Sequence, residues 1–514
     1  MINSLLCGSK PLLCCSKSAN VLAVFLLAAA SGLAAPAQEA QQQVNIDWDK
    51  TVLVSKSTPT LQVVTNPMLN PGAPIHDGSF AALKALGADY VRYVPWLPYP
   101  KIAVAELDPP TKDKTSWDFT YIDPVTKDFL AATDGHSTII NFSTIPAWMF
   151  KTDQPVKYPS DPNQVFWHYT QGTELRDPTG KELGDYFGRL VSWYTKGGFT
   201  DENGKKHDSG YHYTFPYWEV LNEIESEHST TPEDYTKRYD AMVEGIRKVS
   251  PDTKFMGLAL AAPGDNPKYF EYFLNPKNHK PGIPLDYISF HFYATPALDE
   301  TLDGWQHTFF NQARGFLATT RYILAIRDRL SPQTKIDTDE LGVILPTDNT
   351  PADKLPLPGA YWNAAGALYG YLFVELAKQG VDVIGESQLV GYPTQYPSVS
   401  MIDYNNGKPN ARYWVLKLLK DNFHPGDKMV AEKPSKEGDP SDVTVQGFIT
   451  PQGKRVLLVN RTNREKTVTL SQELQNASSL TVDEATGDEA PRAGKAEGAN
   501  FKLAPFAVTV LSVQ

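Results

Sequence analysis

Eight short apolar segments alternate with longer amphipathic stretches through most of the chain, and this alternation limits the fold more than any other feature. The apolar segments are rich in β-branched and aromatic residues, which favour strands, whereas the longer stretches have a helical period. The predicted strands are residues 61–64, 90–93, 137–142, 217–221, 254–258, 287–291, 335–339 and 381–385. The predicted helices include residues 79–86, 183–195, 232–249, 310–330 and 361–379. Such alternation indicates parallel strands with crossover helices, and eight units predict a (β/α)8 TIM barrel of the α/β class.

The connections between these elements also favour a barrel. Turns from helix to strand are short, and residues 250–254 and 331–335 share the pattern Ser-Pro-x-Thr-Lys, in which proline stops the helix. Connections from strand to helix are long, as at 143–181 and 388–409. Long loops gathered on one face form the rim of a barrel's active site. A doubly wound open sheet is the alternative, but the sequence has neither a Gly-x-Gly-x-x-Gly turn nor a Walker loop.

The pattern changes at about residue 422 to short segments of alternating polarity. The predicted strands there are residues 443–450, 455–460, 467–470, 480–483, 501–503 and 506–512. Regular short strands with tight turns predict a β-sandwich. We therefore predict a barrel over residues 45–421 and a C-terminal β-sandwich over 422–514, and we expect residues 45–58 to pair with the sandwich.

The first 37 residues resemble a secretory signal peptide. Lys10 and Lys17 precede an apolar run at 21–30, and small residues follow at 35–37. A membrane anchor is the alternative, but the run is shorter than the roughly 20 residues that span a bilayer. We expect a secreted or periplasmic protein. All three cysteines lie at or before residue 15, so the mature chain would contain no disulfide.

The charge balance argues against several classes of partner. The chain has 48 Lys and Arg against 59 Asp and Glu, a net charge of −11, and no basic run. We therefore expect no nucleic-acid partner and, after signal cleavage, no membrane association. The sequence does not set the oligomeric state.

Two carboxylates stand where a barrel places its chemistry. Residues 217–223 read Tyr-Trp-Glu-Val-Leu-Asn-Glu, so Glu223 falls at the C-terminal end of the fourth strand. Residues 335–342 place Glu340 at the end of the seventh strand. Strand ends of a barrel converge at one mouth. Paired carboxyls, one protonated and one ionised, suit cleavage of a glycosidic bond.

These segments resemble a known family. Trp-Glu-Val-Leu-Asn-Glu at 218–223 and Thr-Asp-Glu-Leu-Gly at 338–342 resemble clan A of the retaining glycoside hydrolases. Trp-Asp-Phe-Thr-Tyr-Ile-Asp at 117–123 and Asp-Tyr-Ile-Ser-Phe-His-Phe-Tyr at 286–293 resemble glycoside hydrolase family 39 in particular. The resemblance implies a barrel with a β-sandwich and a double-displacement mechanism. That family contains β-xylosidases and α-L-iduronidases.

The resemblance assigns roles to the residues that match it. Glu223 matches the acid/base and Glu340 the nucleophile, while Asn222 matches the residue that hydrogen-bonds the sugar 2-hydroxyl.

Three further residues match groups around the nucleophile. Arg92 matches an arginine near it, and a fixed cation there would keep Glu340 ionised. His291 and Tyr293 match residues that line the site and orient the nucleophile. A structural ion pair is the alternative for Arg92, and a core histidine is the alternative for His291.

The chain departs from the family pattern at three places that contact substrate. Ile224 stands where most clan members have proline, no histidine follows Arg92, and Glu-Ser-Gln at 386–388 replaces a terminal tryptophan on strand eight. We predict an exported retaining hydrolase of β-xylosidase type. The alternatives are another clan A specificity (α-L-arabinofuranosidase, β-galactosidase or an endo-glycosidase) and a non-catalytic carbohydrate-binding barrel.

Aromatic residues in the long loops suit binding of an oligo- or polysaccharide, because sugar rings pack their C–H faces on aromatic faces. Trp96 and Trp148 are the strongest candidates, since each follows a strand end closely. The other candidates are Tyr99, Phe150, Trp167, Tyr293, Tyr392 and Tyr396. No His-Glu-x-x-His motif or cysteine cluster is present, so we expect neither a metal nor a cofactor.

Overall fold

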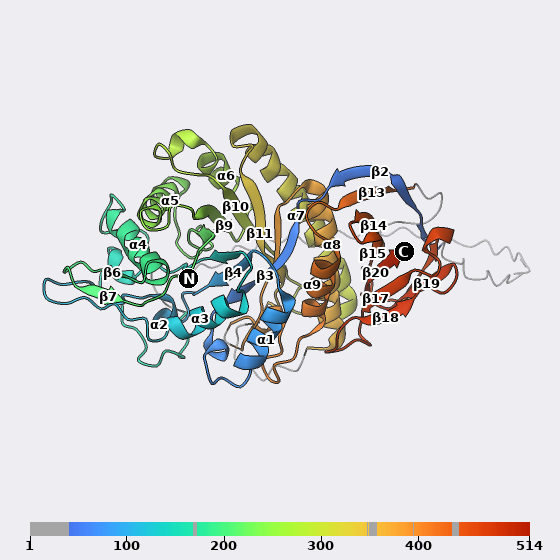
Figure 1. Cartoon of the computed structure of the whole chain (residues 1–514), viewed down its shortest axis with the longest axis horizontal. Helices are drawn as coiled ribbons and strands as arrows, with labels where there is room; N and C mark the ends of the chain where they lie inside the picture. The colour runs from blue at the N-terminus through green and yellow to red at the C-terminus, as the bar shows by residue number, and fades with distance from the viewer. Residues whose placement is uncertain are drawn as a thin grey trace, which may run out of the picture. The chain divides into compact units, whose positions relative to one another are not determined.

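The computed structural model describes residues 41–167, 172–346, 348, 357–393, 395–433 and 442–513. The predicted signal peptide, residues 1–37, lies outside these residues. Eight parallel strands close into a barrel (Figure 1). They are β3 (Thr58–Val64), β4 (Val91–Val94), β5 (Thr138–Ile140), β8 (Tyr217–Glu219), β9 (Lys254–Leu260), β10 (Tyr287–Ala294), β11 (Lys335–Val343) and β12 (Val383–Glu386). Each corresponds to a predicted strand, so the predicted barrel is confirmed.

The helices that alternate with these strands are α1 (His76–Leu86), α2 (Pro100–Ala103), α3 (Asp123–Ala132), α4 (Lys181–Thr195), α5 (Pro232–Arg247), α6 (Pro267–Phe273), α7 (Leu302–Leu330), α8 (Gly359–Gln379) and α9 (Ala411–Asn422). Most of the predicted helices begin a few residues earlier than expected: α1, α4 and α8 by two or three residues and α7 by eight, whereas α5 ends two residues sooner. Local chemistry sets their ends. Helix α5 begins where the Thr231 side chain accepts from the Asp234 N–H, with Pro232 in the first turn. Helix α8 ends at Gly380, whose φ of 79° is the left-handed conformation that favours glycine.

The repeated Ser-Pro-x-Thr-Lys segments form equivalent turns. The hydroxyls of Ser250 and Thr253 lie 2.8 Å apart, and those of Ser331 and Thr334 lie 2.7 Å apart. The threonine hydroxyls donate to backbone carbonyls just before β8 and β10, those of Phe215 and Leu285. Each turn therefore anchors the start of one strand to the neighbouring segment of the barrel floor.

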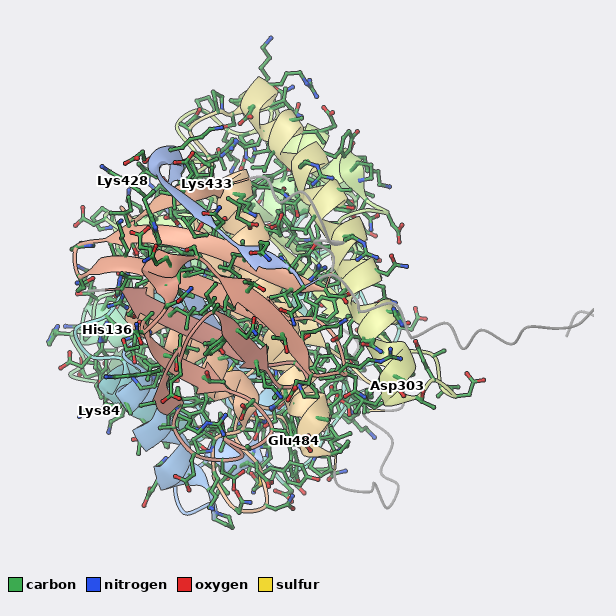
Figure 2. All side chains as sticks on the ribbon, turned by 90° about the vertical axis from the view of Figure 1, so that its right-hand side faces the viewer. Lys84, His136, Asp303, Lys428, Lys433 and Glu484 are labelled. Atoms are coloured by element: carbon green, nitrogen blue, oxygen red, sulfur yellow. The ribbon has the colours of Figure 1, made fainter. Side chains whose placement is uncertain are left out.

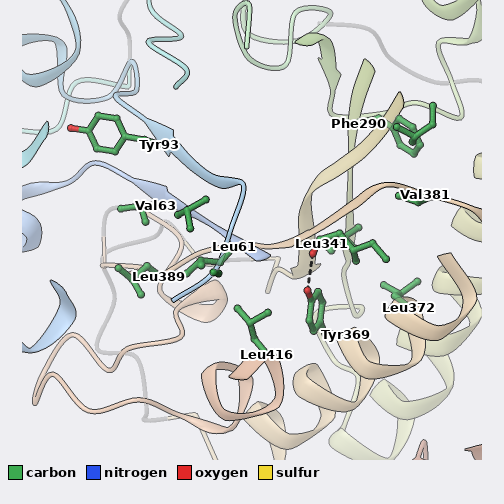
Figure 3. Packing of buried hydrophobic residues seen from close by; sticks show 14 of the residues in the cluster. Leu61, Val63, Tyr93, Phe290, Leu341, Tyr369, Leu372, Val381, Leu389 and Leu416 are labelled. Carbon is green, nitrogen blue, oxygen red and sulfur yellow. Dashed lines mark hydrogen bonds between the residues drawn. The ribbon is translucent and has the colours of Figure 1, made fainter. Parts of the chain in front are cut away.

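A continuous apolar core joins the barrel to its helices. Figure 3 shows part of it, with Leu61 and Val63 of β3 near Leu389 and Leu416. The Tyr369 hydroxyl of α8 donates to the Ile384 carbonyl at 2.7 Å, so a buried polar group is satisfied within this packing.

The barrel interior changes from apolar to polar along the strands. Ile139, Met256, Tyr287 and Val383 form a separate buried cluster packed against Tyr90 and Tyr217. Because inward positions recur every second residue, the next inward layer contains Arg92, Glu219 and Ser289. The apolar layer closes the floor beneath the polar groups described below.

The C-terminal part is a β-sandwich, as predicted. One sheet has the order β18-β17-β20-β15-β14-β13-β2, and the other has the order β1-β16-β19. The bounds are β1 (Gln43–Val44), β2 (Ile46–Val54), β13 (Lys428–Glu432), β14 (Val443–Thr450), β15 (Gly453–Asn460), β16 (Lys466–Leu470), β17 (Ser478–Val482), β18 (Arg492–Lys495), β19 (Asn500–Leu503) and β20 (Val508–Val513). A short hairpin, β6 (Gly198–Thr200) and β7 (Lys206–Asp208), lies outside the sandwich. The sequence did not predict β18, because all four of its residues are exposed and show no alternation.

The N-terminal strands belong to the sandwich sheets. β2 pairs antiparallel with β13, and β1 pairs parallel with β16. The predicted boundary at 421/422 falls at the last residue of α9. Helices α8 and α9 lie between the barrel and the larger sheet, in contact with its strands (Figure 1).

Figure 2 views the molecule from the sandwich side, where exposed charged side chains such as Lys428, Lys433 and Glu484 extend outward. Among the residues that the structure describes, no helix has both the length and the apolar character needed to cross a membrane.

Candidate active site

A cavity opens at the C-terminal ends of the barrel strands. It encloses about 510 Å³ of space, part of it open to solvent. Aliphatic and aromatic side chains form most of its wall, and a few polar groups converge in it, as in a small-molecule site. The lining residues are Gln62, Val64, Val94, Trp96, Asn222, Glu223, Tyr293, Glu340, Ile344, Ser387, Gln388, Tyr396 and Val399. All come from the barrel, and none of these lining residues comes from the sandwich.

The turn after β8 carries Asn222 and Glu223. Leu221 and Glu223 have φ values of 66° and 41°, a left-handed conformation that non-glycine residues rarely adopt outside functional sites. The Glu223 N–H donates to the Ala259 carbonyl of β9 at 2.9 Å, which holds the turn. This tight turn presents both side chains to the cavity.

The Glu340 carboxylate, on β11, accepts hydrogen bonds from the side chains of two other residues. Arg92 Nη1 donates to Oε1 at 2.5 Å, and the Tyr293 hydroxyl donates to Oε2 at 2.6 Å. Burial alone would raise the pKa of Glu340, but His291, Arg92 and the Tyr293 hydrogen bond outweigh it and hold the pKa below its ordinary value. Glu340 is therefore ionised.

A ring of hydrogen bonds surrounds this carboxylate. Gln62 Oε1 accepts from Arg92 Nη1 at 2.7 Å, and Gln62 Nε2 donates to Ser387 Oγ at 2.6 Å. Ser387 Oγ lies 2.6 Å from the Tyr293 hydroxyl. Tyr293 has one proton and gives it to Glu340, which can only accept, so the Ser387 hydroxyl must donate to Tyr293. The ring fixes every proton around the carboxylate.

His291 links the two carboxylates. Its Nδ1 lies 3.0 Å from Glu223 Oε1 and 3.6 Å from Glu340 Oε2. Burial lowers the pKa of His291, but Glu340 and Glu223 outweigh it, and the pKa is raised above its ordinary value. One oxygen of each carboxyl and a ring nitrogen of His291 all lie within 4.8 Å of one another. A divalent cation could bridge such a set, and the expectation of no metal stays a prediction.

Arg92 is buried between acids of the barrel interior. Its Nε donates to Glu219 at 2.5 Å and lies 2.9 Å from Asp339 Oδ2. Burial, together with Glu219, raises the pKa of Asp339 well above its ordinary value, whereas Arg92 and donated hydrogen bonds lower the pKa of Glu219 despite its burial. Arg92 thus pairs with two ionised carboxylates, Glu219 and Glu340. Its positive charge is already compensated within the protein.

Asn222 and Trp96 share a partner. Asn222 Oδ1 accepts from Arg92 Nη2 at 2.6 Å, and its Nδ2 donates to Glu227 Oε1 at 3.0 Å. The Trp96 indole donates to the same oxygen at 2.6 Å. Tyr396 lies beside Trp96 with nearly parallel rings 6.2 Å apart, and both residues line the cavity.

The structure brings seven of the eight predicted site residues together, and Trp148 is the exception. The Trp148 indole donates to the Glu106 carbonyl at 2.8 Å, and the Arg176 guanidinium lies 4.3 Å from the ring centre. Trp148 is not among the lining residues of the cavity. It follows a strand end, as expected, but its ring is held between Glu106 of the preceding strand-to-helix loop and Arg176 of its own loop.

Sequence reasoning missed Gln62, Glu219 and Glu227 as parts of the site, and it expected Ser387 only as part of the 386–388 segment that contacts substrate. Glu219 carried a signal, because an acid inside an apolar strand needs a buried cation. Glu227 follows Glu223 by one helical turn's spacing, which is a weaker signal. Gln62 gave none, and the hydrogen bonds of Ser387 to Gln62 and Tyr293 could not be foreseen, because they join segments far apart in the sequence.

Two family models match parts of this chain. The model of glycosyl hydrolases family 39 matches residues 33–313, more than half of the chain. The chain belongs to glycosyl hydrolases family 39. The matched residues of this family 39 glycosidase include Arg92, Asn222, Glu223 and His291, while Glu340 lies beyond them. A second model, the C-terminal immunoglobulin-like domain of D-apionate lactonase, matches residues 440–511.

Solved structures share the fold of this family 39 glycosidase. A GH51 arabinofuranosidase from Xanthomonas axonopodis pv. citri is 14% identical, with a TM-score of 0.61, covering 92% of this chain and 100% of that one. A GH30 endoxylanase from Clostridium papyrosolvens C71 is 12% identical, with a TM-score of 0.54 and the same coverage. A glucosidase from Croceicoccus marinus is 13% identical, with a TM-score of 0.58, covering 93% and 99%. A search of curated proteins found no match.

Proposed function

We propose that this glycosidase cleaves its substrate by double displacement, with Glu340 as nucleophile and Glu223 as acid/base. The separation of the two carboxyls carries the proposal. Retaining enzymes place their carboxyls about 5–5.5 Å apart, and inverting enzymes place them about 6.5–9.5 Å apart to admit a water. Closest oxygens within 4.8 Å favour the retaining arrangement.

The environments of the two carboxyls support this division of roles. The Glu340 side chain is 10% exposed and held ionised by Arg92 and Tyr293, as a nucleophile requires. The Glu223 side chain is 24% exposed, so it can reach the leaving oxygen and later the attacking water. Glu340 attacks the anomeric carbon while Glu223 protonates the leaving group, and Glu223 then deprotonates the water that releases the sugar.

We propose a neutral sugar, as in a β-xyloside, at the catalytic carboxyls. The lining residues described above include no lysine and no arginine, and Arg92 behind them is already paired. A uronic acid would need a free cation for its carboxylate. This favours a xyloside over an iduronide within the family. An arabinofuranoside, a galactoside or an internal polysaccharide bond remain the rival substrates.

The match to a lactonase domain suggests a second activity on sugar lactones, but the cavity gives it little support. The matched segment is the sandwich, which contributes none of the lining residues that the structure describes. We therefore include an aldonolactone only as a comparison substrate.

We also propose that the protein is exported, on the basis of the predicted signal peptide. Sequencing the N-terminus of protein recovered outside the cytoplasm tests this. A mature chain beginning near residue 38 is expected, and an intact Met1 on exported or retained protein would contradict it.

Aryl glycosides test the chemistry. The E340Q variant should lose all turnover, and a 2-deoxy-2-fluoro glycoside should label the wild-type peptide that contains Glu340.

The E223A variant should still hydrolyse substrates with activated leaving groups, which need little help from an acid, and should no longer hydrolyse the others. E233Q, which neutralises an exposed acid of α5, is the control. Undiminished turnover by E340Q would overturn the nucleophile assignment, and binding of sugars without turnover would favour the non-catalytic barrel.

A further inference from the structure

The turn after the acid/base brings a third carboxyl back to the site. The N–H groups of Ser226 and Glu227 both donate to the Glu223 carbonyl, at 2.9 and 2.7 Å. These bonds close a tight turn, so Glu227 returns beside Asn222 instead of continuing outward. Glu227 does not line the cavity, but the two residues that donate to it do.

Both donors use the same oxygen of Glu227. Trp96 Nε1 and Asn222 Nδ2 lie 2.6 and 3.0 Å from Oε1. The other oxygen, Oε2, is buried and has no hydrogen-bond partner among the described residues. No donor from the described part of the chain stabilises negative charge on this buried oxygen, which favours the neutral form of the carboxyl.

The electrostatic surroundings agree with a neutral Glu227. Burial raises the pKa of Glu227 well above its ordinary value, and negative charge on the neighbouring Glu223 or Glu340 side chain raises it further. The bonds from Trp96 and Asn222 lower it but do not offset these effects.

We propose that Glu227 is a positioning residue, which fixes the Asn222 amide and the Trp96 indole against the sugar through one shared oxygen. The inference rests on the proposed function of this site. Arg92, which can only donate, holds Asn222 Oδ1, and Glu227 holds one N–H, so the second N–H remains for a sugar hydroxyl. Trp96 is held in the same way, with Tyr396 along its face and Trp167 edge-on at 5.3 Å.

Two substitutions separate this role from a need for charge. In E227Q the amide oxygen can accept the same two bonds and the NH₂ group replaces the hydroxyl, so kcat/KM should stay within about threefold of wild type. In E227A the Trp96 indole and the Asn222 amide at the cavity wall lose their shared acceptor, and kcat/KM should fall roughly tenfold to hundredfold. E233Q again serves as the control, and far-UV circular dichroism and Tm establish that each variant is folded.

The double-mutant cycle of Trp96 and Glu227 tests the coupling directly. Part of the effect of Glu227 on kcat/KM passes through the Trp96 indole, and this part is already absent in W96F. Adding E227A to W96F should therefore lower kcat/KM by less than E227A lowers it in the wild type, so the two changes should be non-additive. Fully additive losses would overturn the proposal, as would a folded E227Q that loses as much activity as E227A. If E227A does not fold, E227Q decides the point, because a folded E227Q with kcat/KM well below a third of the wild-type value would overturn the proposal.

A readout without turnover keeps this inference distinct from the proposed function. In protein labelled with ¹⁵N-tryptophan, the Trp96 indole signal is the one of ten that W96F removes. It should move in E227A and keep nearly its wild-type position in E227Q. An unmoved signal in E227A would overturn the inference even in an active enzyme. A moved signal in a protein that hydrolyses no glycoside would instead support the inference and reject the proposed function.

Discussion

At the scale of single residues, the site is defined by how protons are placed. Arg92, Gln62, Ser387 and Tyr293 form a closed path around Glu340 in which each donor has one acceptor assigned. Such preorganised donors stabilise charge without rearranging during the reaction. The Glu340 carboxylate, the proposed nucleophile, is therefore held in place before substrate binds.

Removing one donor should weaken this arrangement measurably. In Y293F the Glu340 carboxylate loses the hydrogen bond to Oε2, and its pKa should rise because that bond lowers it. We expect the acid limb of the kcat/KM profile to move to higher pH and activity at the optimum to fall roughly tenfold to hundredfold. Measuring pH profiles with an activated aryl glycoside checks this. An acid limb that stays in place or moves to lower pH would contradict it.

How far the sequence predicts a residue's place depends on where its partners lie. Asn222, Glu223 and Glu340 could be placed because a strand end in a barrel has one direction to face. Trp148 has the same sequence context, but the Arg176 side chain packs on its ring from a later part of the same loop. Nothing near Ser387 in the sequence indicates that it joins Gln62 to Tyr293.

At the scale of elements, α4 and α5 approach unusually closely because glycines face one another. A Cβ on Gly245 of α5 would lie 1.9 Å from the Gly184 carbonyl oxygen of α4, a contact no side-chain shift can relieve. G245A should therefore lower the free energy of unfolding by about 3 kcal/mol or more.

Gly315 of α7 offers the matched control. A Cβ there would meet nothing within 4 Å, so G315A should stabilise the protein by about 0.5–1 kcal/mol through helix propensity. Denaturant unfolding measures both changes. Equal effects of the two substitutions would refute the close packing of α4 against α5.

The connection between α2 and α3 should make stability depend on pH. Burial raises the pKa of Glu106 to about 8, and the Glu202 carboxylate adds to the effect. The folded protein thus keeps a proton that the unfolded chain releases above its ordinary pKa of 4.5. The stabilisation present below that value is lost as pH rises toward 8, by up to about 1.4 kcal/mol per pH unit.

Glutamine at this position has no proton to lose. Between pH 5 and 8 the Tm of E106Q should therefore fall less than that of wild type, and E174Q, which neutralises an exposed acid, should follow wild type. Parallel Tm curves for wild type and E106Q would show that Glu106 is ionised in the folded protein.

Elements with a strong period could be predicted from sequence, and weakly patterned ones could not. The eight barrel strands are apolar because both of their faces are covered, and α5 and α8 carry clear end signals. The short β18 escaped because all four of its residues are exposed and show no alternation. The start of α7 was predicted too late, at residue 310, although Leu302, Trp305 and Phe309 already have helical spacing.

At the scale of the whole molecule, one apolar core joins barrel and sandwich. Phe448, Leu457 and Val508 of the larger sheet belong to the same buried cluster as Leu372 and Leu416 of the barrel helices. We expect calorimetry of the full chain to show a single transition.

A chain ending at residue 422 should lose solubility, because the apolar faces of α8 and α9 that pack on the larger sheet would be exposed to water. Two resolved transitions, or a truncated barrel with wild-type Tm, would contradict a shared core.

The pairing of β1 and β2 with C-terminal strands has a consequence for how the chain comes together. The Gln42 side chain donates to the Val443 carbonyl, 401 residues later. Closing so long a loop is slow, and non-local pairing lowers folding rates. During synthesis β1 and β2 cannot pair with their C-terminal partner strands until nearly all of the chain has emerged. The sandwich can therefore be completed only after the barrel segment has been synthesised, and β1 and β2 are among the last strands to pair although they precede the barrel in the chain.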